Sequence, residues 1–257
     1  MRAITFVLTP AASKRLIAKA VVSMPEVQRA RKQGRLIVAG GITNAYIAEE
    51  LTGEKVDKAR YTAGIVTESK WSLTPPETRL KPLAFEAGQI SQRMWPEVLQ
   101  DFTGLDVFVK GGNALDPEGN VGILVGGKNG GTIGAAYGHL VALGAHLILP
   151  IGLEKLIPSV TEASRALGQL PLDAPYGMPC GLFPVAYGTV VTEVEALRLL
   201  YGLKAVHVHS GGIGGSEGAV GLVAHGDESA CNRLRDDLGA FLKEEPVGTG
   251  NVNRCCK

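Results

Sequence analysis

Apolar and polar residues follow two periods along this chain, one typical of helices and one typical of strands. Residues 11–22 and 25–32 have the helical spacing, and Thr9 precedes the first of them as an N-cap. LIVAGG then predicts a strand and a tight turn, followed by a helix in ITNAYIAEELTG with Thr43 or Asn44 as its N-cap. The N-terminal part therefore predicts a helical start followed by a strand-turn-helix unit.

The central stretch, residues 106–158, alternates strands, glycine-rich loops and one helix. Residues 105–109 form a short apolar run rich in β-branched side chains, as expected for a strand buried on both faces. The pattern then predicts a strand at 121–125, a helix at 133–143 and a further strand in HLILP. Such alternation is typical of a parallel sheet with crossover helices.

The pattern changes after about residue 178 to a strand-helix-strand-strand-helix order. PVAYGTVVT is extended, EVEALRLLYG is helical, AVHVHS and AVGLVAHG are strands, and DESACNRLRDDLGAFLK is an amphipathic helix. We predict an α/β fold with an open, mostly parallel Rossmann-like sheet and helices on both faces, plus a smaller ferredoxin-like α+β domain. The predicted domains are residues 1–178 and 179–245, followed by a flexible tail at 246–257.

The segment between the two halves of the first domain is less regular. Residues 63–66 predict a strand, and TPPETRLKP predicts a loop because consecutive prolines exclude a helix. Such a loop can fold over a site, with Trp71 packed above it. A surface excursion is the favoured interpretation.

Composition and charge narrow the function classes. The chain has 257 residues, of which 45% are hydrophobic and 20% charged, with a net charge of +1. A near-neutral chain without a basic block predicts no nucleic-acid partner. The short apolar run at the N-terminus is below the length of a secretory segment, and no run approaches the roughly 20 apolar residues of a membrane span. We therefore expect a cytoplasmic protein with no membrane contact.

Cysteines and histidines give weak metal signals. Cys255 and Cys256 are adjacent near the end of the chain, but their spacing matches no common zinc pattern. His207 and His209 alternate on a predicted strand and so share one face, as two metal ligands would. Without a third ligand at a matching spacing, two half-exposed histidines are the favoured interpretation. We predict neither a metal nor a cofactor.

Glycine-rich polar loops follow the predicted strands at their carboxyl ends, which is where ligands bind in open α/β sheets. Lys110 ends the central strand, and Asn113 lies in the loop after it. The second loop, GGKNGGT, precedes the 133–143 helix, so its backbone N–H groups, the Thr132 hydroxyl and the Lys128 ammonium suit a phosphate or carboxylate. Neither loop has P-loop or GxGxxG spacing. The predicted ligand-binding residues are Gly41, Thr43, Asn44, Lys110, Gly112, Asn113, Lys128, Asn129, Gly130, Gly131, Thr132 and Lys155.

Two carboxylates are candidates for acid or base chemistry. Glu154 follows the strand in HLILP and is adjacent to Lys155, which makes it the leading candidate. Asp116 lies in the loop after Lys110 and is the second. The alternative is that Glu154 starts a helical turn and Lys155 is solvated.

The order of parts resembles the ribose-5-phosphate isomerase type A family, within the wider group that includes glucosamine-6-phosphate deaminase and the CoA transferases. LIVAGGITNAYIAEEL is similar to that family's strand, turn and helix around the sugar phosphate. VFVKGGNALDPEGNVGILVGGKNGGTIGAA is similar to its acidic loop followed by its lysine-glycine loop and helix, and the C-terminal part to its lid. The resemblance implies a sugar-phosphate site, with Lys128 as the loop lysine, and a homo-oligomer.

The chain departs from this family at its acidic residues. Lys110 and Asn113 stand in the loop where the family has carboxylates, and Ala136 stands where the family has the glutamate that moves a proton. Two function classes stay open. The first is an isomerase- or transferase-like enzyme acting on a small anionic metabolite, a sugar phosphate or an acyl thioester, with Glu154 as base or nucleophile. The second is a ligand-binding or assembly protein that keeps the fold without turnover.

Overall fold

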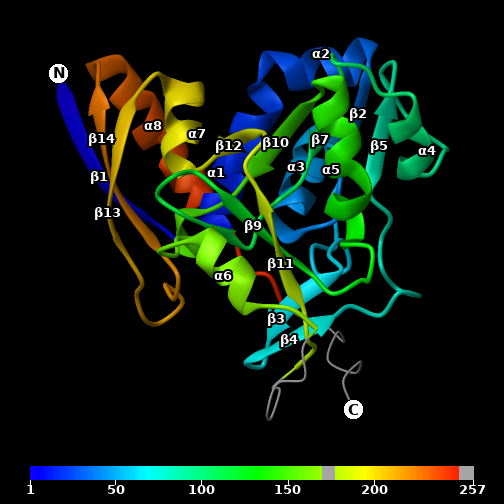
Figure 1. Ribbon diagram of the computed structural model, residues 1–257. Coiled ribbons are helices and arrows are strands. Elements are labelled where there is room, and N and C mark those ends of the chain that lie inside the picture. The colour runs from blue at the N-terminus through cyan, green and yellow to red at the C-terminus, as the bar shows by residue number, and fades with distance from the viewer. Residues whose placement is uncertain (170–176, 249–257) are drawn as a thin grey trace.

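A computed structural model of the chain describes residues 1–169 and 177–248, and its largest sheet has six strands (Figure 1). The first four strands in spatial order are parallel, whereas the last two pair antiparallel at one edge. The chain therefore has the predicted mixed α/β character with a mostly parallel main sheet. In spatial order the strands are β12 (Thr189–Val191), β10 (His146–Pro150), β7 (Val107–Val109), β2 (Arg35–Val38), β5 (Leu83–Glu86) and β6 (Gln89–Ile90).

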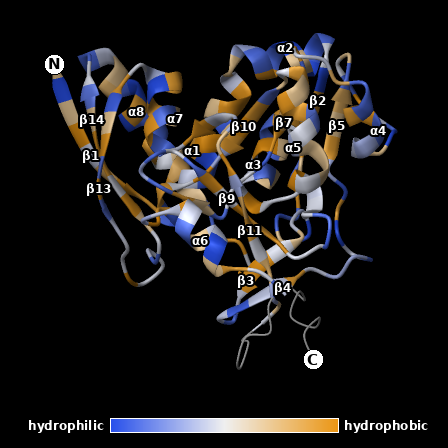
Figure 2. Cartoon of the chain, in the orientation of Figure 1, coloured by the Kyte–Doolittle hydropathy of each residue, from blue (hydrophilic) through white to orange (hydrophobic). Residues whose placement is uncertain are grey.

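Helices cover both faces of this sheet. Successive side chains of a strand point to opposite faces, so the strands contribute to two apolar cores. Val107 and Val109 belong to one core and Phe108 to the other. Figure 2 shows the apolar residues gathered on the strands and on the helix sides between them. The first core includes α1 (Pro10–Ser23), α2 (Pro25–Gln33) and α3 (Ile42–Thr52), and the second includes α4 (Trp95–Gln100) and α5 (Gly131–Leu143).

The helix starts confirm one predicted cap and correct another. The Thr9 hydroxyl accepts a hydrogen bond from a backbone N–H in the first turn of α1, as predicted. Helix α3 begins at Ile42 with Gly41 as its N-cap, so Thr43 and Asn44 lie inside its first turn. The prediction that one of them caps the helix is wrong, because the glycine turn lets the helix begin earlier.

A second sheet joins the N-terminal strand to two strands from the C-terminal part of the chain. Its three strands are antiparallel, in the order β1 (Arg2–Leu8), β14 (Val220–Gly226) and β13 (Lys204–Ser210). Helices α7 (Glu193–Tyr201) and α8 (Glu228–Phe241) pack against it (Figure 1). The sequence did not predict β1, whereas β12, which follows the predicted boundary at residue 178, joins the main sheet.

A β-bulge separates the two histidines of β13. His207 is opposite Leu222 of β14, and His209 is opposite Gly221, so the register shifts between them. Because Leu222 and Gly221 are consecutive, their partners face opposite sides of the sheet. The prediction that the two histidines share one face is therefore wrong. Cys255 and Cys256 lie outside the described residues.

Two smaller antiparallel sheets and two short helices complete the described part. Strand β9 has the predicted bounds, but it pairs with β8 and β11 beside the unit formed by β7, α5 and β10. These elements are β3 (Gly64–Thr67), β4 (Lys70–Leu73), β8 (Ala114–Leu115), β9 (Val121–Val125), β11 (Gly181–Val185), η1 (Leu153–Lys155) and α6 (Val160–Ala166). Over the described ranges, no helix is long and apolar enough to cross a bilayer.

Candidate functional site

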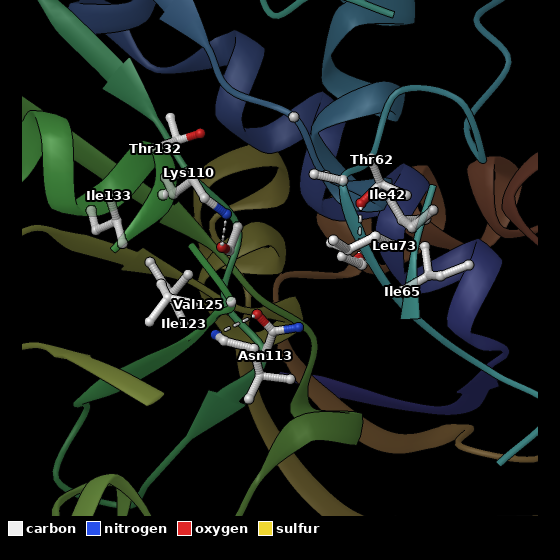
Figure 3. A pocket seen from close by; sticks show the side chains of 18 of the residues that line it. Ile42, Thr62, Ile65, Leu73, Lys110, Asn113, Ile123, Val125, Thr132 and Ile133 are labelled. Atoms are coloured by element: carbon white, nitrogen blue, oxygen red, sulfur yellow. Dashed lines mark hydrogen bonds between the residues drawn. The ribbon is translucent and has the colours of Figure 1, made fainter. Parts of the chain in front are cut away.

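A cavity of about 460 Å³ opens at the carboxyl ends of β2 and β7 (Figure 3). Figure 3 shows Lys110, Ile123 and Thr132 on one side of it and Thr62 and Leu73 on the other. This is the edge of the sheet at which the sequence predicted a site. The lining comprises residues 40–43, 61–66, 71–73, 110–113, 123–127 and 130–133, with Arg79, Leu80, Pro82, Trp95, Lys155, Met178 and Cys180.

Two helices begin at this cavity. The first residues of α3, Ile42 and Thr43, line it, and so do Gly131 and Thr132 at the start of α5. Neither helix has a side-chain cap, and the first N–H groups of a helix have no partner within it. Gly130, at φ +70°, makes the turn into α5. Backbone donors and the positive ends of two helix dipoles are thus directed toward one space.

Asn44 has a structural role behind this wall. Its amide nitrogen donates to the carbonyl oxygens of Ala39 at 2.7 Å and Val109 at 3.2 Å. The side chain is buried and does not line the cavity. Asn44 therefore joins the ends of β2 and β7 and holds two lining loops at a constant separation.

Lys110 and Lys155 place two ammonium groups in the lining. The Nζ of Lys110 donates to the carbonyl of Gly111 at 2.9 Å, and the Nζ of Lys155 donates to that of Gly112 at 2.8 Å. Burial, followed by the charge of Lys155, lowers the pKa of Lys110 to about 8. Within the described ranges, no carboxylate forms an ion pair with either lysine.

Charged groups lie behind Lys155. Burial, followed by the Lys14 charge, lowers the pKa of Lys155 to about 8, while Glu154 and Glu193 act in the opposite sense. Burial raises the pKa of the Glu193 carboxyl, although a hydrogen bond from Leu153 N–H partly opposes it. These groups set the charge of Lys155 without lining the cavity.

Glu154, the leading catalytic candidate, is engaged elsewhere. Its carboxylate accepts a hydrogen bond from Lys14 at 2.6 Å, and both side chains are mostly buried. It does not line the cavity, although its neighbour Lys155 does. The pair therefore splits in η1, with the lysine on the cavity and the glutamate paired to α1.

Asn113 and Gly112 both line the cavity but serve the loop itself. The Asn113 side chain accepts a hydrogen bond from Leu124 N–H at 3.0 Å (Figure 3). A Cβ on Gly112 would lie 2.3 Å from Val121 and 2.8 Å from Ile151, so close packing requires this glycine. The loop after β7 is thus held rigidly against β9.

Besides Asn44 and Glu154, three more predicted site residues lie outside the lining. Asp116 is buried and accepts hydrogen bonds from Asn120 and from Val160 N–H. Lys128 and Asn129 are exposed at the tip of the loop before α5. Ala136, which we expected to replace the resembled family's glutamate, is buried in the second core.

The wall formed by β3, β4 and the loop after them was missed as a site component. Trp71 lines the cavity, whereas a surface excursion was the favoured interpretation. Arg79 lines it too, and its Nε donates to the Thr74 hydroxyl at 2.8 Å. The sequence feature that could have indicated this wall is TPPETRLKP, in which an arginine follows two prolines in a loop that can fold over a site.

The lining has a distinct chemical character. Its charged members are Lys110, Lys155 and Arg79, and none of the described lining residues is acidic. Cys180 lines it as a buried free thiol whose pKa is raised by burial. No group of three potential metal-binding side chains occurs in the described ranges. No family model, curated protein or solved structure matches the chain.

Proposed function

We propose that this cavity binds a small anionic metabolite of the sugar-phosphate or acyl-thioester class. The observation that carries the proposal is the one-sided charge of the lining, which has three cationic side chains and no acidic one among the described residues. An anion there receives charge-assisted hydrogen bonds from side chains and from two helix starts. The cavity volume of about 460 Å³ suits a molecule of metabolite size.

The apolar part of the lining narrows the ligand class further. Ile65, Trp71 and Leu73 lie on the hairpin wall, while Ile123 and Val125 belong to β9. A free inorganic anion uses none of this surface, whereas a metabolite with a carbon skeleton covers it. A ligand with its anionic group at the two helix N-termini and its carbon chain toward β3 and β4 would contact both the charged and the apolar parts of the lining.

The fold resemblance is a further part of this proposal. We assign the main sheet to a Rossmann-like domain and the second sheet with its helices to a ferredoxin-like one, as in the ribose-5-phosphate isomerase type A group. In this proposal the ligand lies at the same edge of the sheet as in that group, but different side chains contact it. Ala136 is buried where the group has its glutamate, so the group's proton transfer has no counterpart there.

A non-catalytic binding protein is the second candidate. It is favoured because Glu154 and Asp116, the two predicted catalytic carboxylates, do not line the cavity. NMR of ribose 5-phosphate incubated with the protein separates the two candidates. New sugar resonances indicate turnover, whereas an unchanged spectrum together with measured binding indicates a binding protein.

Thermal unfolding of the full chain tests the proposal. Glycerol 3-phosphate, ribose 5-phosphate and coenzyme A are compared with glycerol, ribose and pantetheine. A ligand that binds only the folded state stabilises it by about 2.7 kcal/mol at a concentration of 100 Kd. We expect at least one phosphorylated compound to raise Tm, and its neutral counterpart to have no effect.

Arg79→Gln supplies the residue-level test, with Arg60→Gln as the matched control. Loss of a charged donor costs about 1.5–3 kcal/mol, so we expect the Arg79 variant to bind about 10- to 100-fold more weakly. Arg60 tethers the same loop through Thr78 O at 2.7 Å but is exposed and does not line the cavity. Equal stabilisation by neutral compounds, or equal binding by both variants, contradicts the proposal.

A further inference from the structure

Lys110 differs from the exposed Lys128 in its surroundings. Its side chain is half-buried at the end of β7, and Figure 3 shows it beside Thr132 and Ile133 at the start of α5. Its hydrogen bond in this structure goes to the adjacent Gly111 carbonyl, which is a neutral acceptor. No carboxylate among the described residues pairs with it, so nothing anionic holds the amine in its charged form.

A second cation lies close by. The charge of Lys155 acts on Lys110, and Lys155 is itself held by the Gly112 carbonyl from the same loop. The carbonyls of two adjacent residues therefore hold both amines in the lining of one cavity. Burial together with a neighbouring cation is the arrangement that gives a lysine a reactive neutral amine.

We propose that Lys110 forms an imine with the carbonyl carbon of an anionic aldehyde or ketone bound in this cavity. The assignment depends on the proposed function, because the helix N-termini and Arg79 bind the anionic group of that ligand. Lys155, which lines the same cavity, positions the carbonyl oxygen.

The step is balanced without any other reactant. The neutral Nζ of Lys110 adds to the carbonyl carbon, and one of the two Nζ protons passes to the carbonyl oxygen to give a carbinolamine. The carbinolamine then loses its hydroxyl group together with the second Nζ proton as water, while a C=N bond forms. Amine and carbonyl compound thus give imine and water, with no change of oxidation state.

Neighbouring side chains favour this step over hydrolysis. Ile123, Val125 and Ile133 lie on the same side of the cavity as Lys110 (Figure 3). Apolar neighbours limit the water near the amine and keep part of it neutral. The lowered pKa of Lys110 agrees with this placement.

Reductive trapping tests the proposal on the full chain. The protein is incubated with dihydroxyacetone phosphate or pyruvate in the presence of cyanoborohydride, digested and mapped by mass spectrometry. We expect one saturable adduct at Lys110, formed at least about tenfold faster than at the exposed Lys128, because a lower pKa leaves more neutral amine. Lys110→Arg should abolish it, whereas Lys128→Arg should retain it.

A non-reacting compound separates this inference from the proposed function. Glycerol 3-phosphate has the anionic group but no carbonyl, so it should raise Tm and slow the trapping without forming an adduct. Stabilisation by a carbonyl probe without an adduct at Lys110 overturns the imine and leaves the binding site intact. Adducts spread evenly over exposed lysines of the wild-type protein also overturn it, even if Lys110→Arg does not fold. If no phosphorylated compound raises Tm, the proposed function fails and the imine fails with it.

Discussion

Asp116 is a buried carboxylate in the turn between β8 and β9. Its oxygens accept hydrogen bonds from Asn120 N–H at 2.8 Å, from the Asn120 side chain at 3.0 Å and from Val160 N–H at 3.0 Å. Burial alone would raise the pKa of Asp116, but these hydrogen bonds lower it below its ordinary value of 3.8. Its position implies that it joins this turn to the start of α6 and does not act on a ligand.

Asp116→Asn should therefore lower stability and leave binding unchanged. The amide places a donor where N–H groups now donate, so the free energy of unfolding should fall by about 1–3 kcal/mol in urea denaturation. Since the folded pKa is lowered, the carboxylate stabilises the protein above its unfolded pKa. The difference from wild type should hold above about pH 5 and shrink as pH falls through the folded pKa. Weaker ligand binding at unchanged stability would instead assign Asp116 to the site.

At the scale of elements, helix α5 presents two glycines with different surroundings. A Cβ on Gly134 would lie 2.2 Å from the carbonyl oxygen of Asn129, which is backbone of the loop before the helix. A Cβ on Gly138 would meet nothing within 4 Å. The first glycine therefore allows the loop to fold back on the helix start, whereas the second has no such role.

Gly134→Ala and Gly138→Ala form a matched pair. Alanine has the higher helix propensity, so Gly138→Ala should raise the free energy of unfolding by up to about 1 kcal/mol. The same gain at Gly134 is outweighed by the clash, and we expect a net loss of about 1–3 kcal/mol together with weaker ligand binding. Urea denaturation and the Tm shift with glycerol 3-phosphate measure the two effects. Similar values for the two variants would show that the loop moves freely.

At the scale of the whole molecule, an ion-pair cluster joins segments far apart in the chain. Arg15 of α1 donates to Glu49 and Glu50 of α3 and to Glu244 after α8. Lys58 donates to Glu49 at 2.7 Å. Together with the pairing of β1 and β14, this cluster joins the N-terminal part of the chain to its C-terminal part.

Arg15→Met should destabilise the protein far more than Arg2→Met. Removing one member of a buried ion pair costs about 3–5 kcal/mol. In this cluster the buried Glu49 would keep only Lys58 as a cationic partner among the described residues, and the partly exposed Glu50 and Glu244 would lose Arg15. Arg2 pairs with Glu228 at 2.7 Å on the exposed surface, where a pair contributes about 0–1 kcal/mol. Urea denaturation of both variants checks the difference. A cost for Arg15→Met no larger than that for Arg2→Met would show that the cluster does not hold these segments together.

Local patterns in the sequence determined most of the elements and part of the site. Strand β9 has its predicted bounds, and α5 begins two residues before the prediction, because apolar periodicity and glycine positions act over a few residues. Lys110 and Lys155, two of the predicted ligand-binding residues, line the cavity at the carboxyl edge of the sheet, and their binding role stays a prediction. Lys110 directly follows the buried strand β7, and ligands bind at the carboxyl ends of such strands.

Only the tertiary structure decided which distant segments meet. The pairing of β1 with β14, the bulge between His207 and His209 and the wall that carries Arg79 each depend on contacts between segments remote in sequence. For the same reason Glu154 turned toward Lys14, and Lys128 remained at an exposed loop tip. Local periodicity specifies which face of an element is apolar. It does not specify which partner covers that face, since many apolar surfaces are equivalent until the whole chain is packed.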